Sequence, residues 1–326
     1  MLAAYRRTGA DPPFGDPRGY HGVGMEGHFW RITQPASGAV VVAIVAISRD
    51  AADRPWAMAS LAAHPGGEVR SATLSEAWAA PRGLALRAGD AVAADERSLR
   101  MTLGDDARLE VAFEDPLPWP RRAFGALGPA HAIPGLSQYW HPWLLRARVS
   151  GVARIGAAEI DLDGAVAYAE KNWGAGGMPP SWWWGQAHGF DRPDACVAFA
   201  GGRAGIGPAR GPATALVVAL GNEVRSVVRP PRPLQVAVDE RGWRLAGGGI
   251  EVEGHADGVA PHLLPVPVPH ERRRLDDWAP QHLTGTLRLR VTRRGRTQYE
   301  GTSHLAGLEL GRGHQARPPR TSRKYE

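Results

Sequence analysis

The sequence predicts an all-β protein of the barrel or sandwich type. Short apolar runs recur along the whole chain, separated by turns that contain Gly, Pro or Asp, as is typical of barrels and sandwiches. The 326 residues include 41 Gly and 28 Pro without a collagen-like period, which favours a turn-dense β architecture. No convincing amphipathic stretch of about ten residues has the spacing of a helix. Together these observations favour strands over helices throughout.

The individual strands are placed by the apolar runs and by the turn residues between them. The expected strands are His28–Thr33, Ala39–Ser48, Trp56–Ala63, Leu84–Ala88, Ser98–Leu103, Ala107–Phe113, Leu144–Ile155, Glu159–Leu162, Ala165–Lys171, Trp182–Phe190, Ala195–Ala200, Ala213–Leu220, Val224–Val228, Leu234–Val238, Gly242–Leu245, Ile250–Glu253, Leu283–Thr292 and Arg296–Leu305.

The chain is long enough for two domains, with 326 residues and 43% hydrophobic content. Gly201–Pro212 is rich in Gly, Pro and Arg and lies between two strand-dense halves. Such a stretch is typical of a linker. We therefore expect an N-terminal domain over residues 1–205 and a C-terminal domain over residues 206–326.

Charge and cysteine content restrict the partners and the compartment. The net charge is +6, and the basic residues, nearly all Arg, are scattered without a nucleic-acid motif, so no nucleic-acid partner is expected. The single cysteine, Cys196, excludes an intrachain disulfide and fits a reducing compartment. No secretory signal is visible, and the longest apolar run, Ala39–Ile47, is too short to cross a bilayer as a helix. We expect a cytoplasmic protein, with peripheral membrane contact left open and the oligomeric state undetermined.

The segment Ala165–Phe190 carries most of the chemical information. Alternation along the first strand puts Tyr168 and Glu170 on one face and Lys171 on the other. The second strand presents one wide aromatic and polar face and one face of small residues. Its wide face carries Trp182, Trp184, Gln186, His188 and Phe190. Such a face suits the wall of a ligand cavity or, alternatively, an aromatic barrel core with satisfied polar groups.

Lys171 and Asn172 stand out by composition. All but two of the 39 basic residues are Arg, and Asn occurs only at positions 172 and 222. A rare Lys beside a rare Asn indicates a place where a compact ammonium is needed and a planar guanidinium does not fit. The site is either functional or a buried ion pair in which Lys171 compensates a carboxylate.

The same segment resembles the signature of the tocopherol cyclases. The resemblance is carried by Glu170-Lys171-Asn172-Trp173-Gly174 and the Trp-x-Trp-x-Gln of Trp182, Trp184 and Gln186. Weaker matching blocks are Gly19-Tyr20-His21, Glu26-Gly27 with Arg31, Tyr299-Glu300-Gly301 and Ala306-Gly307-Leu308-Glu309. The chain departs from the plant cyclases at His28-Phe29-Trp30, Met178-Pro179 and Ala187-His188, where a ligand would be held.

The resemblance implies two packed lipocalin-like β-barrel domains and a hydrophobic prenylated substrate. Tocopherol cyclases add a phenol oxygen across a prenyl double bond, which needs a proton donor in a dry pocket and no metal or redox cofactor. On this view Glu170, Lys171 and Glu26 are the catalytic candidates. His188 or His141 serves as a weak base. The substrate-binding candidates are Tyr168, Asn172, Trp173, Trp182, Trp184, Gln186, His188, His141 and Trp140.

Each assignment has a structural alternative. Glu170 and Lys171 also suit an ion-pair network, Glu26 suits the framework of the first domain, and His141 suits aromatic core packing. For the whole chain, the alternative to a cofactor-independent cyclase, isomerase or hydratase is a non-catalytic lipocalin-like protein that binds a hydrophobic metabolite. A purely structural β protein is disfavoured by the cluster of rare residues.

Overall fold

The protein is almost entirely β-sheet, as the sequence predicts. The computed structural model describes residues 1–326 except 121–123, 177, 241, 257, 259, 267–272, 274, 276–277 and 313–326. Within this part of the chain the only helices are α1 (Leu2–Arg6) and the short 3-10 helix η1 (Gly128–Ala132). None of the helices in the described ranges has the length and apolar character needed to span a membrane.

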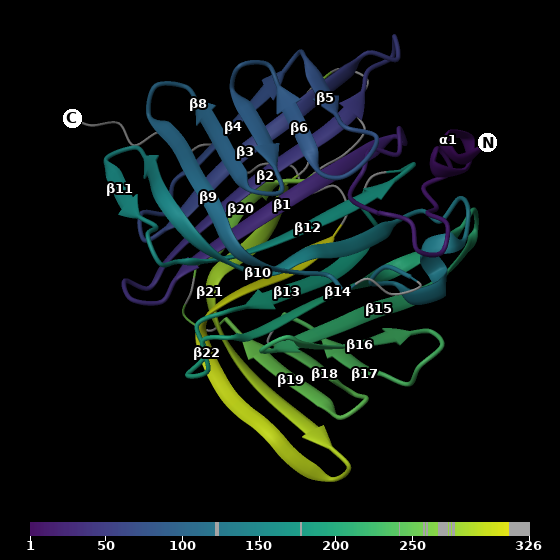
Figure 1. The fold of residues 1–326 in the computed structure, drawn as a ribbon, viewed down its shortest axis with the longest axis vertical. Helices are drawn as coiled ribbons and strands as arrows, with labels where there is room; N and C mark the ends of the chain where they lie inside the picture. Colours follow the sequence, from purple (N-terminus) through teal and green to yellow (C-terminus); the bar gives the residue numbers. More distant parts are fainter. Residues whose placement is uncertain are drawn as a thin grey trace.

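The first sheet holds the strands of the N-terminal half, all paired antiparallel (Figure 1). Its main path runs β4-β3-β2-β1-β12-β10-β9-β8-β7-β6-β5, and β11 pairs with β10. Because β3 and β5 also contact each other, the sheet nearly closes into a barrel. The strands are β1 (Met25–Gln34), β2 (Ala39–Arg49), β3 (Pro55–His64), β4 (Val69–Leu74), β5 (Ala77–Ala79), β6 (Ala85–Ala88), β7 (Val92–Asp95), β8 (Ser98–Leu103), β9 (Ala107–Pro118), β10 (Tyr139–Ile155), β11 (Ala158–Asp161) and β12 (Val166–Gly174).

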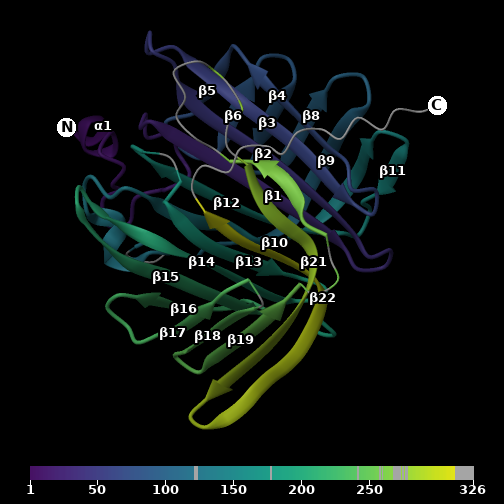
Figure 2. The same ribbon diagram turned by 180° about the vertical axis from the view of Figure 1, so that it is seen from behind.

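The second sheet holds the C-terminal strands and is also antiparallel. Its path runs β16-β15-β14-β13-β22-β21-β19-β18-β17, and β20 pairs with β21. Figure 2 shows β20 against the first sheet, and β20 contacts β3. The strands are β13 (Ser181–Ala187), β14 (Ala195–Ile206), β15 (Ala209–Leu220), β16 (Glu223–Arg229), β17 (Gln235–Val238), β18 (Trp243–Gly247), β19 (Ile250–His255), β20 (His262–Pro265), β21 (Trp278–Arg293) and β22 (Arg296–Arg312).

The expected linker at Gly201–Pro212 is wrong. This stretch forms the ends of β14 and β15, with Ile206 opposite Ala209 across a tight turn. Its glycines serve close contacts and the turn: a side chain at position 201 would overlap the indole of Trp183, and Gly207 has a φ of 54°. The chain changes sheet between Gly174 and Ser181 instead. The domains expected at residues 1–205 and 206–326 stay a prediction.

Three buried clusters account for most of the core. One lies inside the first sheet around Trp30, Leu61 and Leu99, and another lies in the second sheet around Phe199. A third cluster joins side chains of both sheets. Its members include Phe29 of β1 and Leu264 of β20. The outer face of β1 and β12 is therefore as buried as the inner one, which explains why every residue of β1 is buried.

Arg31 of β1 connects the two sheets. Its side chain is fully buried, and its Nη2 donates hydrogen bonds of 2.6 Å to the carbonyl oxygens of Leu283 and Leu305. The β21–β22 pairing is irregular here, so these two residues fall outside the register, and a bulge leaves their carbonyl groups in need of donors. Nη1 donates to Thr33 Oγ1 at 2.6 Å and to Gln186 Oε1 at 3.3 Å. Arg31 thus fills a gap in the sheet hydrogen bonding.

Replacing Arg31 by Lys should destabilise the protein without changing its net charge. One ammonium group cannot reproduce the planar fork, so a buried acceptor at the interface loses its donor, which costs about 1–3 kcal/mol. Urea unfolding measures this loss. Arg244→Lys is the control, because Arg244 pairs with Glu253 on the surface. Equal urea unfolding midpoints for Arg31→Lys and Arg244→Lys would contradict the bridging role of Arg31.

Candidate functional site

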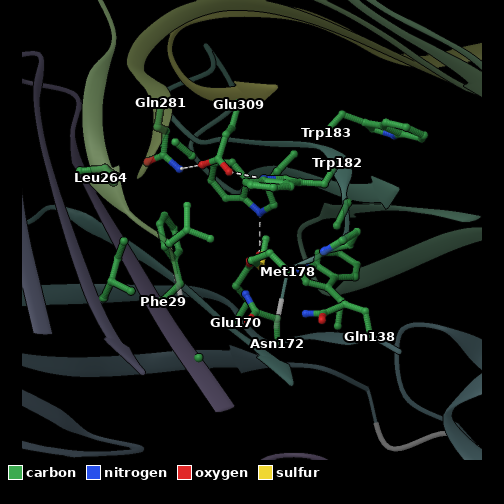
Figure 3. Close-up of a pocket in the computed structure, with 18 of the residues that line it drawn as sticks. Phe29, Gln138, Glu170, Asn172, Met178, Trp182, Trp183, Leu264, Gln281 and Glu309 are labelled. Carbon is green, nitrogen blue, oxygen red and sulfur yellow. Dashed lines mark hydrogen bonds between the residues drawn. The ribbon is translucent and has the colours of Figure 1, made fainter. Parts of the chain in front are cut away.

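A pocket lies between the two sheets, where β1 and β12 face β13, β21 and β22 (Figure 3). Its walls are mostly aromatic and aliphatic, with a few carboxyl and amide groups. The lining residues are Gly27, His28, Phe29, Ile44, Gln138, Trp140, Glu170, Asn172, Met178, Pro179, Trp182, Trp183, Trp184, Ala200, Leu264, Pro265, Val266, Ala279, Gln281 and Glu309. Apolar walls with few polar groups are typical of a small-molecule site.

Glu170 of β12 points into this pocket from the first sheet. It lies opposite Phe29 in the β1–β12 register, on the outer face of the first barrel. Its Oε2 accepts hydrogen bonds from the hydroxyl of Tyr168 at 2.6 Å and from the indole nitrogen of Trp184 at 2.9 Å. The predicted shared face of Tyr168 and Glu170 is confirmed. Tyr168 does not line the pocket but orients the carboxyl group.

Burial controls the protonation of Glu170. Removal from water raises the pKa of this carboxyl group to about 7, and the hydrogen bonds from Tyr168 and Trp184 oppose part of that rise. Both of these donors act on Oε2. Near neutral pH the group therefore exists partly as a neutral carboxylic acid beside an aromatic wall, as acid catalysis of an alkene requires.

Trp182 and Trp184 of β13 line the pocket, as the sequence predicts. Both side chains are buried, and Trp184 meets the ring of Phe29 edge to face at 5.0 Å between centroids. Trp140 and Asn172, also predicted to bind substrate, line the pocket from β10 and β12. The pocket thus brings together five of the predicted residues, with Glu170 among them.

Several amide atoms at the pocket lack a partner within the described residues. They are Asn172 Oδ1, Gln281 Oε1 and both side-chain polar atoms of Gln138, and all are buried. A buried polar atom without a hydrogen bond costs free energy, about 1–3 kcal/mol in proteins. Polar groups of a bound ligand would satisfy these atoms.

Gln186 and His188, expected on the pocket wall, lie outside it. The pocket does not extend along β13 as far as Gln186, because the buried side chain of Arg31 lies there and donates to Gln186 Oε1. The Nε2–H of His188 donates to the carbonyl of Leu145 at 3.0 Å, and its Nδ1 accepts from Gln186 Nε2 at 3.2 Å. Burial, reinforced by the charge of Arg31, lowers the pKa of His188 to about 3. Both side chains are structural partners in the interface that Arg31 bridges.

Lys171 and Glu26 lie on the other face of β12 and β1, inside the first barrel, and do not line the pocket. Lys171 Nζ is 2.6 Å from Glu26 Oε2 and donates to the carbonyl of Gly19 at 2.7 Å. Burial alone would raise the pKa of Glu26, but the charge of Lys171 and a hydrogen bond from His21 outweigh it and lower the pKa to about 2. Glu26 is therefore ionised and unsuited to donate a proton, and the ion-pair alternative describes this pair.

Trp173 and His141 also lie away from the pocket. Trp173 stacks on Tyr139 at 5.3 Å and on His21 at 4.7 Å, and Lys171 Nζ lies 4.9 Å from its ring centroid. His141 is buried, and its Nδ1 accepts a hydrogen bond of 3.4 Å from the amide of Ala126. Burial lowers its pKa well below the ordinary value. Neither ring faces Glu170.

Sequence reasoning missed Glu309 and Gln281. Glu309 of β22 accepts hydrogen bonds from Trp182 Nε1 and, at 2.7 Å, from Gln281 Nε2 of β21 (Figure 3). One signal was available: Glu309 is the only charged residue in the apolar run Leu305–Leu310. Gln281 carried no such signal, because its place depends on how β21 pairs.

These features define a two-sheet β protein with a ligand-type pocket between its sheets, containing a buried carboxyl group and tryptophan walls. A family model described as tocopherol cyclase-like matches residues 136–312, more than half of the chain. The chain therefore belongs to the tocopherol cyclase-like family, and the predicted resemblance is confirmed. No curated protein matches the sequence significantly.

Two solved structures share the architecture across most of their length. CghA, solved with Sch210972, has a TM-score of 0.56 at 10% identity, and the match covers 91% of this chain and 90% of CghA. Kievitone hydratase from Nectria haematococca has a TM-score of 0.50 at 12% identity, and the match covers 90% of this chain and 90% of the hydratase. The fold is therefore the double lipocalin-like architecture that the sequence predicts.

Proposed function

We propose that this chain is an acid catalyst that promotes addition to a carbon–carbon double bond of a hydrophobic, prenylated small molecule. The observation that carries this proposal is the position of Glu170, whose carboxyl group is held at the wall of a pocket rich in tryptophan. Protonation of an alkene creates a carbocation, which the faces of Trp182 and Trp184 would stabilise. The apolar walls would keep water from capturing it.

The proposed reaction is a cyclisation or the related hydration or isomerisation, and none of these requires a redox step. In a cyclisation the nucleophile is a hydroxyl group of the substrate, and in a hydration it is water. Family membership and the name of a hydratase among the structural relatives support this class. A prenylated quinol is the substrate that the family resemblance favours. It serves as the first probe.

The proposal predicts a rate that falls as pH rises through about 7. Glu170 must be protonated to donate, and burial raises its pKa to about 7. The rate constant should fall about tenfold per pH unit well above pH 7. Single-turnover assays with a prenylated hydroquinone, followed by mass spectrometry, measure it: an unchanged product mass indicates cyclisation or isomerisation and an added water indicates hydration.

A pH-independent rate between pH 5 and 9 would contradict acid catalysis by Glu170.

The second candidate function is binding without turnover, which the unpartnered amide atoms of Gln138, Asn172 and Gln281 favour because they suit a polar ligand group. Mass spectrometry of small molecules retained by the purified protein separates the two. A retained molecule that the protein leaves unchanged supports binding alone.

A further inference from the structure

Glu309 occupies the side of the pocket that belongs to the second sheet. Figure 3 shows it beside Gln281 and Trp182, with Glu170 and Asn172 on the other side. Its carboxylate oxygens each accept one N–H hydrogen bond, Oε1 from Trp182 and Oε2 from Gln281. Two N–H donors stabilise the charged form of a carboxyl group.

Strand β13 places the two carboxyl groups in related settings. Trp182 and Trp184 are two residues apart and share a face, so their indole N–H groups point into the same pocket. Trp184 donates to Glu170 of the first sheet, and Trp182 donates to Glu309 of the second. One pocket therefore holds two carboxyl groups from opposite walls, each oriented by an indole.

Gln281 indicates what belongs beside Glu309. Its side chain is 2% exposed. While its Nε2 donates to Glu309, its Oε1 is buried without a donor among the described residues. An amide oxygen accepts hydrogen bonds only, so the missing partner is a donor group such as a hydroxyl. Gln281 is one of the residues that line the pocket, so a ligand in the pocket is the group that could supply this donor.

We propose that a substrate hydroxyl binds beside the hydrogen-bonded pair of Gln281 and Glu309, and that Glu309 accepts its proton while Glu170 donates a proton to the double bond. This inference rests on the proposed function. The hydroxyl hydrogen is free to rotate from the oxygen of Gln281 to the carboxylate of Glu309.

Every proton that moves in this step has a donor and an acceptor. The carboxylic acid of Glu170 gives its proton to one alkene carbon, and the other carbon becomes cationic. The hydroxyl oxygen attacks that carbon and forms the C–O bond, while the O–H bond breaks and its proton passes to Glu309. One carboxyl group has lost a proton and the other has gained one. Transfer from Glu309 to Glu170 through water restores the starting state.

The raised pKa values of the two carboxyl groups fit the roles of Glu170 as the acid and Glu309 as the base. Burial raises the pKa of both carboxyl groups, and Glu170, whose pKa reaches about 7, is raised further by the charge of Glu309. Ionisation of one group therefore favours protonation of the other. A pair with one proton between the two groups supplies one acid and one base.

The test compares wild type with Glu309→Gln, using a prenylated hydroquinone and its dimethyl ether as probes. Binding is followed by tryptophan fluorescence, and turnover is followed by mass spectrometry. Wild type should bind the hydroquinone about 10–100-fold more tightly than the ether, the range expected for hydrogen bonds to a charged group. Glu309→Gln should abolish most of that preference and slow turnover by about 10²-fold or more.

Glu300→Gln is the matched control, because Glu300 lies on the same strand and pairs with Arg288 on the surface. It should leave both readouts unchanged. A Glu309→Gln protein with wild-type preference and rate would overturn the inference while leaving the proposed function standing. A wild type that prefers the hydroquinone through Glu309 but does not convert it would sustain the hydroxyl site and refute the catalytic function. No binding of either probe would overturn both.

Discussion

Replacing Glu170 by Gln should lower single-turnover rates by about 10²–10⁴-fold while changing ligand affinity little. Glutamine keeps the size of the side chain and still accepts the hydrogen bonds from Tyr168 and Trp184, but it carries no transferable proton. The pocket walls remain in place, so binding through apolar contacts persists. The rate with a prenylated hydroquinone and the dissociation constant from fluorescence measure the two effects separately.

The control for Glu170→Gln is Tyr168→Phe, which removes one hydrogen bond to the carboxyl group but leaves the proton donor in place. That hydrogen bond lowers the pKa of Glu170, so its loss should move the fall in rate to higher pH with a much smaller loss at low pH. Melting temperatures of both variants show whether either change reflects lost folded protein. Wild-type turnover in Glu170→Gln would remove Glu170 from the mechanism.

The parts of this site that were predictable depend on local alternation. Strand periodicity alone places Tyr168 and Glu170 on one face and Lys171 on the other, and the register of β12 agrees. The same rule places Trp182 and Trp184 together. Gln186 and His188 also lie together, as their hydrogen bond shows, but alternation does not indicate how far along the strand the pocket extends, and both lie outside it.

The remaining parts depend on contacts between distant segments. Glu309 and Gln281 meet Trp182 only because β22 lies between β13 and β21 in the second sheet, an arrangement that no local pattern encodes. The prediction of a linker at Gly201–Pro212 is wrong for a related reason. Glycine is needed there by the close approach of Trp183 and by the β14–β15 turn, and composition alone does not separate a linker from a glycine-rich hairpin.

Lys171, which stands out by composition, lies in an unusual environment inside the first barrel. The ammonium contacts Glu26, the carbonyl of Gly19 and, at 2.9 Å, the Nδ1 of His21. The Nε2–H of His21 in turn donates to Asp11 at 2.8 Å. Gly19, His21 and Asp11 come from the segment before β1, so Lys171 holds that segment against the end of the barrel. Three acceptors so close together suit the compact ammonium of Lys better than the planar guanidinium of Arg.

Replacing Lys171 by Met should destabilise the protein by about 3–5 kcal/mol, because it leaves the buried carboxylate of Glu26 without a counter-ion. Methionine keeps the length of the side chain, so the packing against Trp173 changes little. The double variant Glu26→Gln/Lys171→Met removes both charges and should recover part of the loss. Urea unfolding of the wild type, the single variant and the double variant measures both effects.

The pH dependence separates this structural role from a catalytic one. The folded-state pKa of Glu26 is lowered to about 2, against about 4.3 in an unfolded chain. The stabilisation from its ionised form is therefore fully present above about pH 5 and is lost as pH falls toward 2. The difference in unfolding free energy between wild type and Lys171→Met should be largest near neutral pH and shrink in acid. If Lys171→Met instead unfolded like wild type at every pH but lost turnover, the ammonium would belong to the chemistry, and the ion pair inside the barrel would not be its main role.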